Sequence, residues 1–479
     1  MANWKNIKKI DAHIHIIPDV VHEANPDSED EWVYADQSKY LNLMKEYNIE
    51  QAIIMPLNDP YLMSMEFTVD SVNKNLKELV SKYPDKFYAM ADIDTSNSIE
   101  NMKKNLIKAI EEYKLNGLKI HPNNTGMNVD DDYNVALLEL VNKYGLPVFI
   151  HSYPNSKDDC SATYRIKYLI NKFPNIKFII SHMGAYQYEY LLDTNCYVDI
   201  SAILSDYVNK LGIKETNKIL RKFGVDRLVF ATDYPCSRCL NPEEIYDRYF
   251  DILNQMDFND EEIKMIAYDN IKNILDNIKI KEHYDLLIDE NNDSFRDCKE
   301  LHEYMNTWDG QQFIEELKLC NNDNVLEVGI GTGRIAVKVA PYCFCLTGID
   351  FSSKTIKRAK ENLNKYKNIT YIYDDFITHQ FNNTFDKIYS SLTFMHFNNK
   401  KRAIHKIDSL LNKGGIFVLS IDKNKSNCID MGTRKINIYP DNLNNITEII
   451  KTTNMNIVKV IELENAHVIV CYKNKHLYF

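Results

Sequence analysis

Ile10-Asp11-Ala12-His13-Ile14-His15-Ile16-Ile17 is the stretch around which the first half of this chain is organised. Its apolar residues are typical of a buried strand. Side chains two positions apart on a strand point to the same face, so His13 and His15 project side by side. Two parallel imidazoles are suitable ligands for a divalent transition metal. The pattern fits two hydrogen-bonded histidines on a half-buried strand equally well.

Short apolar segments alternate with amphipathic segments over the first 280 residues. Eight such units are expected of a (β/α)8 barrel, in which each parallel strand is followed by a helix. A doubly wound open sheet is the alternative, but eight parallel strands of this size usually close. The expected strands are Lys9–Ile17, Gln51–Pro56, Phe87–Ile93, Gly117–His121, Val148–Tyr153, Lys177–His182, Tyr197–Ser201 and Leu228–Asp233, and the expected helices include Ser71–Tyr83, Ile99–Lys114, Asp132–Tyr144, Tyr164–Phe173 and Thr216–Phe223.

Chemically reactive side chains stand at the carboxyl ends of five of these strands. The active sites of barrels lie at that end, where the loops converge. A single strand-end histidine is often only hydrogen-bonded, and a single strand-end aspartate often caps the next helix. Their occurrence at one end of five strands therefore indicates a site. These side chains are His13 and His15 on the first strand, Lys119 and His121 on the fourth, and His151, His182 and Asp233 on the fifth, sixth and eighth.

These motifs resemble the amidohydrolase superfamily over roughly residues 8–276, and in detail the branch that contains aminocarboxymuconate-semialdehyde decarboxylase. The segment Asp11–His15 matches the family's first-strand motif, and His151 matches its fifth-strand ligand. His182 matches the sixth-strand histidine, and Asp233 the eighth-strand aspartate. The resemblance implies one divalent metal, with zinc expected and one position open for water. The implied ligands are His13, His15, His151 and Asp233.

The chemistry that the resemblance implies is the activation of water. A divalent metal lowers the pKa of bound water toward neutrality. Asp233 would take a proton from the attacking water and pass it to the leaving group. His182 would polarise the scissile carbonyl or stabilise the developing oxyanion. In the decarboxylase relatives the histidine at this place acts as an acid and base for carbon–carbon cleavage, so hydrolysis and decarboxylation both stay open.

Two cationic side chains near the predicted site have more than one interpretation. Lys119 stands where some superfamily members carry a carboxylated lysine that bridges two metals. Because this branch usually holds one metal, binding of a substrate carboxylate or a structural role at the strand end is expected instead. Arg238 fits either an anion-binding residue at the barrel mouth or an exposed surface residue. It lies within Cys236-Ser237-Arg238-Cys239, a lone C-x-x-C pair that we interpret as two reduced thiols.

A chain of 479 residues is too long for one ordinary core. The stretch Lys281–Cys298 is polar and poor in apolar periodicity. We therefore place the domain boundary near Asn277–Lys281. This division gives a barrel at residues 1–280 and a second domain at residues 281–479.

A strand, a glycine-rich turn and a helix follow one another near the start of the second domain. The strand Asn324–Val328 runs into Gly329-Ile330-Gly331-Thr332-Gly333, and a helix continues from Ile335. Such a turn at a helix N-terminus forms a cradle for a nucleotide-type cofactor. The dinucleotide fingerprint G-x-G-x-x-G requires glycine at position 334, where this chain has Arg334. Asp350 ends the next strand and is placed to accept hydrogen bonds from ribose hydroxyls.

This second half resembles the class I S-adenosylmethionine-dependent methyltransferases, which have a Rossmann-like fold, over about residues 284–479. Ser390–Phe394 and Leu410–Val418 match the family's fourth-strand motif and its fifth strand. The acceptor is not identified, because methyl transfer mainly needs a nucleophile aligned with the methyl group. The resemblance assigns cofactor binding to Glu327, Gly329, Gly331, Gly333, Asp350 and Asp375, while Tyr304, Trp308 and His396 either shape the acceptor pocket or only pack.

The net charge and composition indicate which classes of binding partner to expect. The formal net charge is −11 and neither half is basic, which argues against nucleic acid and favours small-molecule substrates. No apolar run is long enough to span a membrane, and the N-terminus lacks a secretory signal, so no membrane partner and a cytoplasmic location are expected. The ten cysteines are then expected to be reduced thiols. The oligomeric state, a homo-oligomer included, stays open.

The sequence therefore predicts a bifunctional α/β enzyme, a metal-dependent hydrolase fused to a methyltransferase. In one alternative the barrel is a non-oxidative decarboxylase. In another, the methyltransferase half only binds S-adenosylmethionine.

Overall fold

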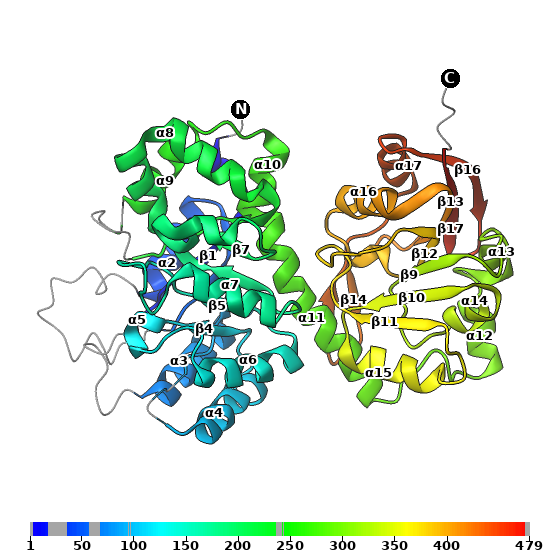
Figure 1. Cartoon of the computed structure of the whole chain (residues 1–479), viewed down its shortest axis with the longest axis horizontal. Helices are drawn as coiled ribbons and strands as arrows, with labels where there is room; N and C mark the ends of the chain where they lie inside the picture. The colour runs from blue at the N-terminus through cyan, green and yellow to red at the C-terminus, as the bar shows by residue number, and fades with distance from the viewer. Residues whose placement is uncertain are drawn as a thin grey trace, which may run out of the picture. The chain divides into compact units, whose positions relative to one another are not determined.

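The computed structural model describes residues 3–17, 36–56, 68–93, 95, 97–235, 242 and 244–474. The chain forms two compact units, Met1–Ile274 and Leu275–Phe479 (Figure 1). The division falls inside one helix, α11 (Asn270–Asp289), which also runs through the boundary expected from the sequence near Asn277–Lys281. In the part of the chain that is described, no helix is long and apolar enough to cross a membrane.

All eight strands predicted for the first unit are present, several of them shorter than predicted. Each strand pairs in parallel with the next within two sheets, β1-β2-β3 and β4-β5-β6-β7-β8. Most of their residues are buried, as expected for barrel strands that are covered on both faces. The strands are β1 (Lys9–Ile14), β2 (Ile49–Ile54), β3 (Phe87–Ala89), β4 (Leu118–Ile120), β5 (Val148–Ile150), β6 (Phe178–Ile180), β7 (Tyr197–Asp199) and β8 (Leu228–Val229).

Backbone hydrogen bonds join the two sheets at both seams. Just beyond β3, Lys119 N donates to Ala91 O at 2.9 Å, and just beyond β8, Asp233 N donates to His13 O at 2.8 Å. Isolated parallel bridges lie at the same two places. The eight strands thus follow one another around a ring, which confirms the predicted (β/α)8 architecture.

Amphipathic helices surround the strands (Figure 1). Several begin at a side chain that accepts a hydrogen bond from the first turn, as Asp36, Thr68, Ser98 and Asp131 do. Their apolar faces are buried, so the ring is covered on the outside. The helices are α2 (Gln37–Glu46), α3 (Val69–Lys82), α4 (Ile99–Glu111), α5 (Pro122–Thr125), α6 (Asp132–Tyr144), α7 (Thr163–Lys172), α8 (Ile203–Phe223), α9 (Ile245–Leu253) and α10 (Asp260–Lys264).

A buried carboxylate connects β1 to the end of β8 and to α9. Asp11 is fully buried. Its Oδ2 accepts hydrogen bonds from Thr232 Oγ1 and from Tyr246 Oη, both at 2.6 Å, and Thr232 N donates to Oδ1 at 3.1 Å. This network holds the first strand in place directly before His13.

The second unit is built on a seven-stranded sheet in the order β11-β10-β9-β12-β13-β17-β16. The first five are parallel, and β17 is antiparallel to both β13 and β16. The strand order reverses between β9 and β12, which is where open α/β sheets bind their ligands. The strands are β9 (Asn324–Val328), β10 (Cys345–Asp350), β11 (Ile369–Tyr373), β12 (Phe385–Ser391), β13 (Leu411–Asp422), β16 (Met455–Glu462) and β17 (Ala466–Lys473).

Hydrophobic clusters lie on both faces of this sheet. Successive residues of β9 alternate between them, with Leu326 and Val328 in one cluster and Val325 in the other. The sheet is therefore covered by helices on both sides, as the predicted Rossmann-like fold requires. The helices are α12 (Lys299–Met305), α13 (Gly310–Glu315), α14 (Ala336–Val339), α15 (Ser353–Asn362), α16 (Lys400–Leu410) and α17 (Leu443–Lys451), and a hairpin is formed by β14 (Cys428–Asp430) and β15 (Lys435–Asn437).

We predict that Tyr246→Phe lowers the free energy of unfolding by about 1–3 kcal/mol, because it removes a donor from the buried Asp11 carboxylate. Urea denaturation measures the change. Tyr144→Phe is the matched control, because its hydroxyl bonds to Glu111 in an exposed position. An equal effect of both substitutions would contradict the role assigned to the Asp11 network.

Candidate functional site

Five histidines gather at the carboxyl end of the barrel strands. His13 and His15 lie at the end of β1, while His121, His151 and His182 follow β4, β5 and β6. The ring centroids of His13 lie 5.4 Å from those of His15 and of His182. The rings of His151 and His182 are 4.8 Å apart, and those of His121 and His151 stack at 3.8 Å. The sequence predicted that these histidines come together at the rim of the barrel.

Three of the four predicted metal ligands lie together. The Nε2 atoms of His13 and His15 are 3.2 Å and 3.4 Å from the same oxygen, Oδ1 of Asp233. The possible ligand atoms of these three residues all lie within 4.8 Å of one another. Two imidazole nitrogens and a carboxylate oxygen therefore face a common point.

The fourth predicted ligand, His151, is not part of the group formed by His13, His15 and Asp233. Its Nδ1 is 3.1 Å from Nε2 of His182, and its ring stacks on His121. His151 therefore joins the cluster through His182, outside the three-residue group. Its role as a ligand stays a prediction.

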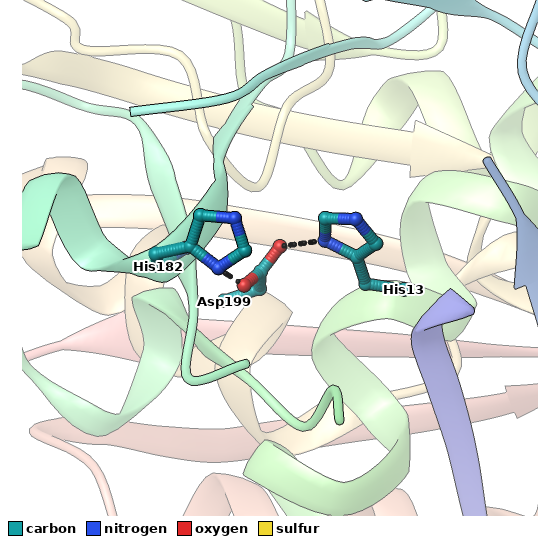
Figure 2. Close-up of side chains that lie close together, drawn as sticks. All are labelled: His13, His182 and Asp199. Carbon is teal, nitrogen blue, oxygen red and sulfur yellow. Dashed lines mark hydrogen bonds and ion pairs between the residues drawn. The ribbon is translucent and has the colours of Figure 1, made fainter. Parts of the chain in front are cut away.

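The second nitrogen of His13 contacts a residue that the sequence interpretation missed. His13 Nδ1 lies 3.2 Å from Oδ2 of Asp199, which stands between His13 and His182 in Figure 2. Burial alone would raise the pKa of the Asp199 carboxyl, but its contacts with His13 and His182 hold that pKa below the ordinary value. A histidine that ligates a metal commonly donates its other ring N–H to a carboxylate. Asp199 therefore orients His13 with Nε2 toward Asp233.

The signal for Asp199 was present in the sequence. Asp199 ends β7, as the other site residues stand at the ends of their own strands. The trio His13, His182 and Asp199 also brings possible ligand atoms within 4.8 Å of one another. However, Asp199 Oδ1 already accepts hydrogen bonds from the backbone N of His182 and of Ser201, at 3.0 Å and 3.1 Å. This trio is thus a hydrogen-bond network that supports the group formed by His13, His15 and Asp233.

Two of the predicted site residues have a left-handed backbone. The φ angles are 59° at His182 and 66° at Asp233. Such a conformation costs a non-glycine residue about 1–3 kcal/mol and is concentrated at functional sites. Asp233 N donates to His13 O, and His182 N donates to Asp199, so hydrogen bonds within the site hold both conformations.

The protonation states suit metal binding. Burial, with Lys119 nearby, lowers the pKa of His13 to about 4, so its imidazole is neutral at neutral pH. Burial would raise the pKa of Asp233, but His13, His15 and His182 outweigh it and lower that pKa to about 2. Neutral imidazole and ionised carboxylate are the forms that bind metals, so the donor set fits a divalent ion.

Lys119 reaches the same centre. Its Nζ donates to Ser181 Oγ at 2.9 Å and lies 3.5 Å from His13 Nε2. Burial lowers the pKa of Lys119 to about 8, against the opposing effect of Asp199 and Asp233. The other predicted substrate-binding residue, Arg238, and the pair of cysteines around it lie outside the described residues.

The glycine-rich turn of the second unit leaves open space at its centre. The φ angles of Gly329, Gly331 and Gly333 are 82°, 55° and 98°. A Cβ on Gly329 would lie 2.1 Å from Thr393 Oγ1, and one on Gly333 would lie 2.7 Å from Leu363. A Cβ on Gly331 would meet nothing within 4 Å. The turn is thus packed at both ends and open in the middle, which fits a cradle for a ligand.

The three predicted acidic residues lie at or near the carboxyl ends of the neighbouring strands β9, β10 and β11. Glu327 is buried, accepts a hydrogen bond from Tyr389 Oη at 2.8 Å, and has its pKa raised by burial. Asp350 Oδ2 accepts from Gly331 N at 3.1 Å, and burial raises its pKa to about 6. Asp375 Oδ1 accepts from Ile377 N at 2.8 Å. The acids and the glycine turn therefore form one edge of the sheet, which fits S-adenosylmethionine.

An ion pair explains the arginine at position 334. Arg334 contacts the Asp309 carboxylate through both terminal nitrogens, at 2.9 Å and 2.5 Å. Ser391 Oγ donates to the same carboxylate at 2.7 Å. The buried pair ties the glycine turn to the end of β12. No sequence pattern predicted this pair, because its two residues are far apart in the chain and follow no periodic spacing.

The three residues considered for the acceptor pocket differ in environment. Tyr304 is 56% exposed, and its ring meets that of Trp308 edge-on at 5.1 Å. His396 is buried, and its Nε2 lies 2.8 Å from Tyr284 Oη.

The geometry agrees with comparisons to known families. Residues 10–276, more than half of the chain, match the family model described as amidohydrolase. The chain belongs to the amidohydrolase family. Residues 326–419 match a second model, described as a methyltransferase domain, so both units of the chain belong to enzyme families.

Individual relatives match one unit each. Malonyl-[acyl-carrier protein] O-methyltransferase 2 of Ilyobacter polytropus is 34% identical over 100 residues, which are 20% of this chain and 38% of that relative. The 2,6-dihydroxybenzoate decarboxylase from Rhizobium is 16% identical with a TM-score of 0.42, covering 56% of this chain and 98% of its own. The N-methyltransferase NodS from Bradyrhizobium japonicum is 18% identical with a TM-score of 0.31, covering 36% and 97%.

We predict that Asp199→Asn weakens metal binding by about 10- to 100-fold, because the amide no longer accepts from His13 Nδ1 as a carboxylate does. Competition with a chelator measures the affinity. The control is Asp251→Asn, at an exposed position of α9. Unchanged affinity in Asp199→Asn would contradict the orienting role.

Proposed function

We propose that this amidohydrolase-family chain is a bifunctional enzyme. Its barrel would hydrolyse a small molecule with a divalent metal, and its second unit would transfer a methyl group from S-adenosylmethionine to a small-molecule acceptor. The observation that supports the barrel assignment most directly is the orientation of His13, with Nδ1 on Asp199 and Nε2 on Asp233.

In this proposal His13, His15, His151 and Asp233 hold the metal, and zinc is the expected ion because it binds imidazole and carboxylate ligands in sites of this type. When bound, such an ion lowers the pKa of a water ligand toward neutrality and polarises a carbonyl group. His151 would complete the set through the side of its ring that does not face His182.

The side chains of this chain supply the proton transfers. Asp233, whose lowered pKa keeps it ionised at neutral pH, accepts a proton from the attacking water and passes it to the leaving group. His182 Nδ1 faces the carbonyl oxygen of Ser201, so its Nε2 would donate a hydrogen bond to the developing oxyanion only once the ring is protonated. Lys119 binds a carboxylate of the substrate, which its buried ammonium would neutralise.

A second candidate for the barrel is non-oxidative decarboxylation. The contact between His182 Nε2 and His151 Nδ1 favours it, because two adjacent imidazoles can pass a proton to a carbon atom. The carbon–carbon bond would break, carbon dioxide would leave, and the proton would take its place. Incubation with candidate carboxylates separates the two reactions, because released carbon dioxide rules out simple hydrolysis of that substrate.

In the second unit, Glu327, Gly329, Gly331, Gly333, Asp350 and Asp375 would bind S-adenosylmethionine. The open space beside Gly331 and the hydrogen bond from its N–H to Asp350 support this assignment. A unit that only binds the cofactor is the alternative, and binding without transfer to pooled metabolites would favour it. The net charge of −11 supports small-molecule substrates over nucleic acid, and we propose a cytoplasmic enzyme without a membrane partner.

We predict that His151→Ala and Asp233→Ala each lower the bound metal to well below one ion per chain, because each removes a ligand. Elemental analysis of the purified variants measures the content. His405→Ala, at an exposed position of α16, is the control and keeps the wild-type content. Full occupancy in both ligand variants would overturn the ligand assignment.

We predict that Asp350→Ala weakens S-adenosylmethionine binding at least about tenfold, because it removes a charged acceptor beside the glycine turn. Isothermal titration calorimetry measures the affinity. Asp430→Ala, at an exposed position of the β14–β15 hairpin, leaves the affinity unchanged. Equal affinities in the two variants would exclude Asp350 from the cofactor site.

A further inference from the structure

Tyr284 and His396 form a hydrogen-bonded pair in the second unit to which the assignments above give no definite role. Tyr284 Oη lies 2.8 Å from His396 Nε2, and the two rings meet edge-on with their centroids 5.5 Å apart. Tyr284 belongs to α11, and His396 ends the short helix η7 (Phe394–His396) that follows β12. His396 is only 7% exposed.

The pair lies at the edge of the sheet that carries the cofactor cradle. The ring of Tyr284 also meets that of Phe351, the residue after Asp350, at 6.3 Å. On the other side, Thr393, three residues before His396, packs against Gly329 of the turn. Tyr284 therefore connects the loops that follow β10 and β12, the two strands that flank β9.

One nitrogen of His396 has no hydrogen-bond partner in the part of the chain that the structure describes. Nδ1 is buried and makes no hydrogen bond to any of the residues that the structure describes. Burial, with Lys400 and His283 nearby, lowers the pKa of His396 to about 3, so the ring is neutral. A neutral imidazole has one donor and one acceptor nitrogen, and leaving either unpaired in the interior costs about 1–3 kcal/mol. A polar group of a ligand would remove that cost.

The charges around His396 restrict this ligand. Lys400 pairs with Asp441 at 2.7 Å, and His283 accepts from Arg434 Nε at 3.1 Å. Among the described residues, no carboxylate contacts His396. Arg434 is itself paired with Glu290, so these cations are balanced by carboxylates. The surroundings therefore suit a neutral group whose oxygen gains negative charge during a reaction.

We propose that His396, oriented by Tyr284, binds the methyl acceptor and takes its proton, and that the acceptor is a small molecule with a hydroxyl group. This proposal rests on the proposed methyltransferase function. In the tautomer that it requires, His396 Nε2–H donates to Tyr284 Oη, and Nδ1 keeps the lone pair that accepts the proton. Carboxylate and free-amine acceptors have a lone pair available already and need no such base, whereas a hydroxyl group does.

The atoms and charges balance in one step. The acceptor O–H bond breaks while the bond between that oxygen and the methyl carbon forms. The bond from the methyl carbon to sulfur breaks, and its electron pair stays on sulfur. The proton goes to His396 Nδ1 and then to solvent. The site holds one positive charge throughout, on sulfur before the transfer and on the imidazole after it.

The test uses the full chain with methyl-labelled S-adenosylmethionine and three mixtures of simple compounds, which are phenols and alcohols, primary amines, and carboxylic acids. His396→Gln keeps an amide N–H near the Nε2 position for Tyr284 but has no basic nitrogen. Tyr284→Phe removes only the hydroxyl that orients the imidazole. His405→Gln, at an exposed position of α16, is the matched control. Calorimetry with S-adenosylmethionine on every variant reports whether the cofactor site is intact.

The expected result is label in the hydroxyl mixture, recovered as a methyl ether. His396→Gln lowers kcat for that transfer by about 10²- to 10⁴-fold and leaves the Kd for S-adenosylmethionine within about twofold. Tyr284→Phe lowers kcat by about tenfold with little change in the KM of the acceptor, because it acts through His396 and not through binding. His405→Gln behaves as the wild type.

Three results would overturn the proposal while the cofactor still binds: label in the amine or carboxylate mixture, no label in the hydroxyl mixture, or wild-type kcat in His396→Gln. A wild-type chain that does not bind S-adenosylmethionine would instead refute the proposed methyltransferase function itself. The calorimetry therefore distinguishes the two failures.

Discussion

The hydrogen bond between His13 Nδ1 and the Asp199 carboxylate is the interaction on which the organisation of the barrel site depends. It determines which nitrogen of the buried, neutral imidazole of His13 faces the centre of the barrel. The backbone of the same histidine accepts the hydrogen bond from Asp233 N that joins the end of β8 to β1. Closure of the barrel therefore brings together His13 and Asp233, two of the proposed metal ligands, because a barrel open at this seam would separate them.

In the second unit, too, the site residues come together because parallel strands end side by side, here in an open sheet. Parallel strands bring their carboxyl ends to one edge, and the order reverses between β9 and β12. The glycine turn, Asp350 and the loop that carries His396 lie close together because each follows or ends a strand whose carboxyl end is at this edge. His396 Nδ1 has no hydrogen-bond partner among the residues described. We propose a ligand as the missing partner.

The sequence predicted the fold and much of the site because both follow local rules. Alternating strands and helices, and histidines two residues apart, are visible without coordinates. The observed strands are shorter than expected: β5 ends at Ile150, although His151 N still donates to Ile120 O at 2.9 Å. Asp199 was visible by the same strand-end rule and was missed. The Arg334–Asp309 pair was not visible in the sequence, since it joins residues without any local pattern.

Helix α11 continues past residue 280, where the sequence predicted a domain boundary, despite its polar composition. The Lys281–Asp285 pair at i,i+4 spacing stabilises it there.

Anomalous diffraction at the zinc absorption edge, from crystals of the purified chain, tests the central claim most directly. The account predicts one peak at about 2.0–2.2 Å from nitrogens of His13, His15 and His151 and an oxygen of Asp233. Asp199 should remain hydrogen-bonded to His13 Nδ1 and outside the coordination sphere. A peak bound by Asp199 and His182, or no peak at the rim of the barrel, would contradict it.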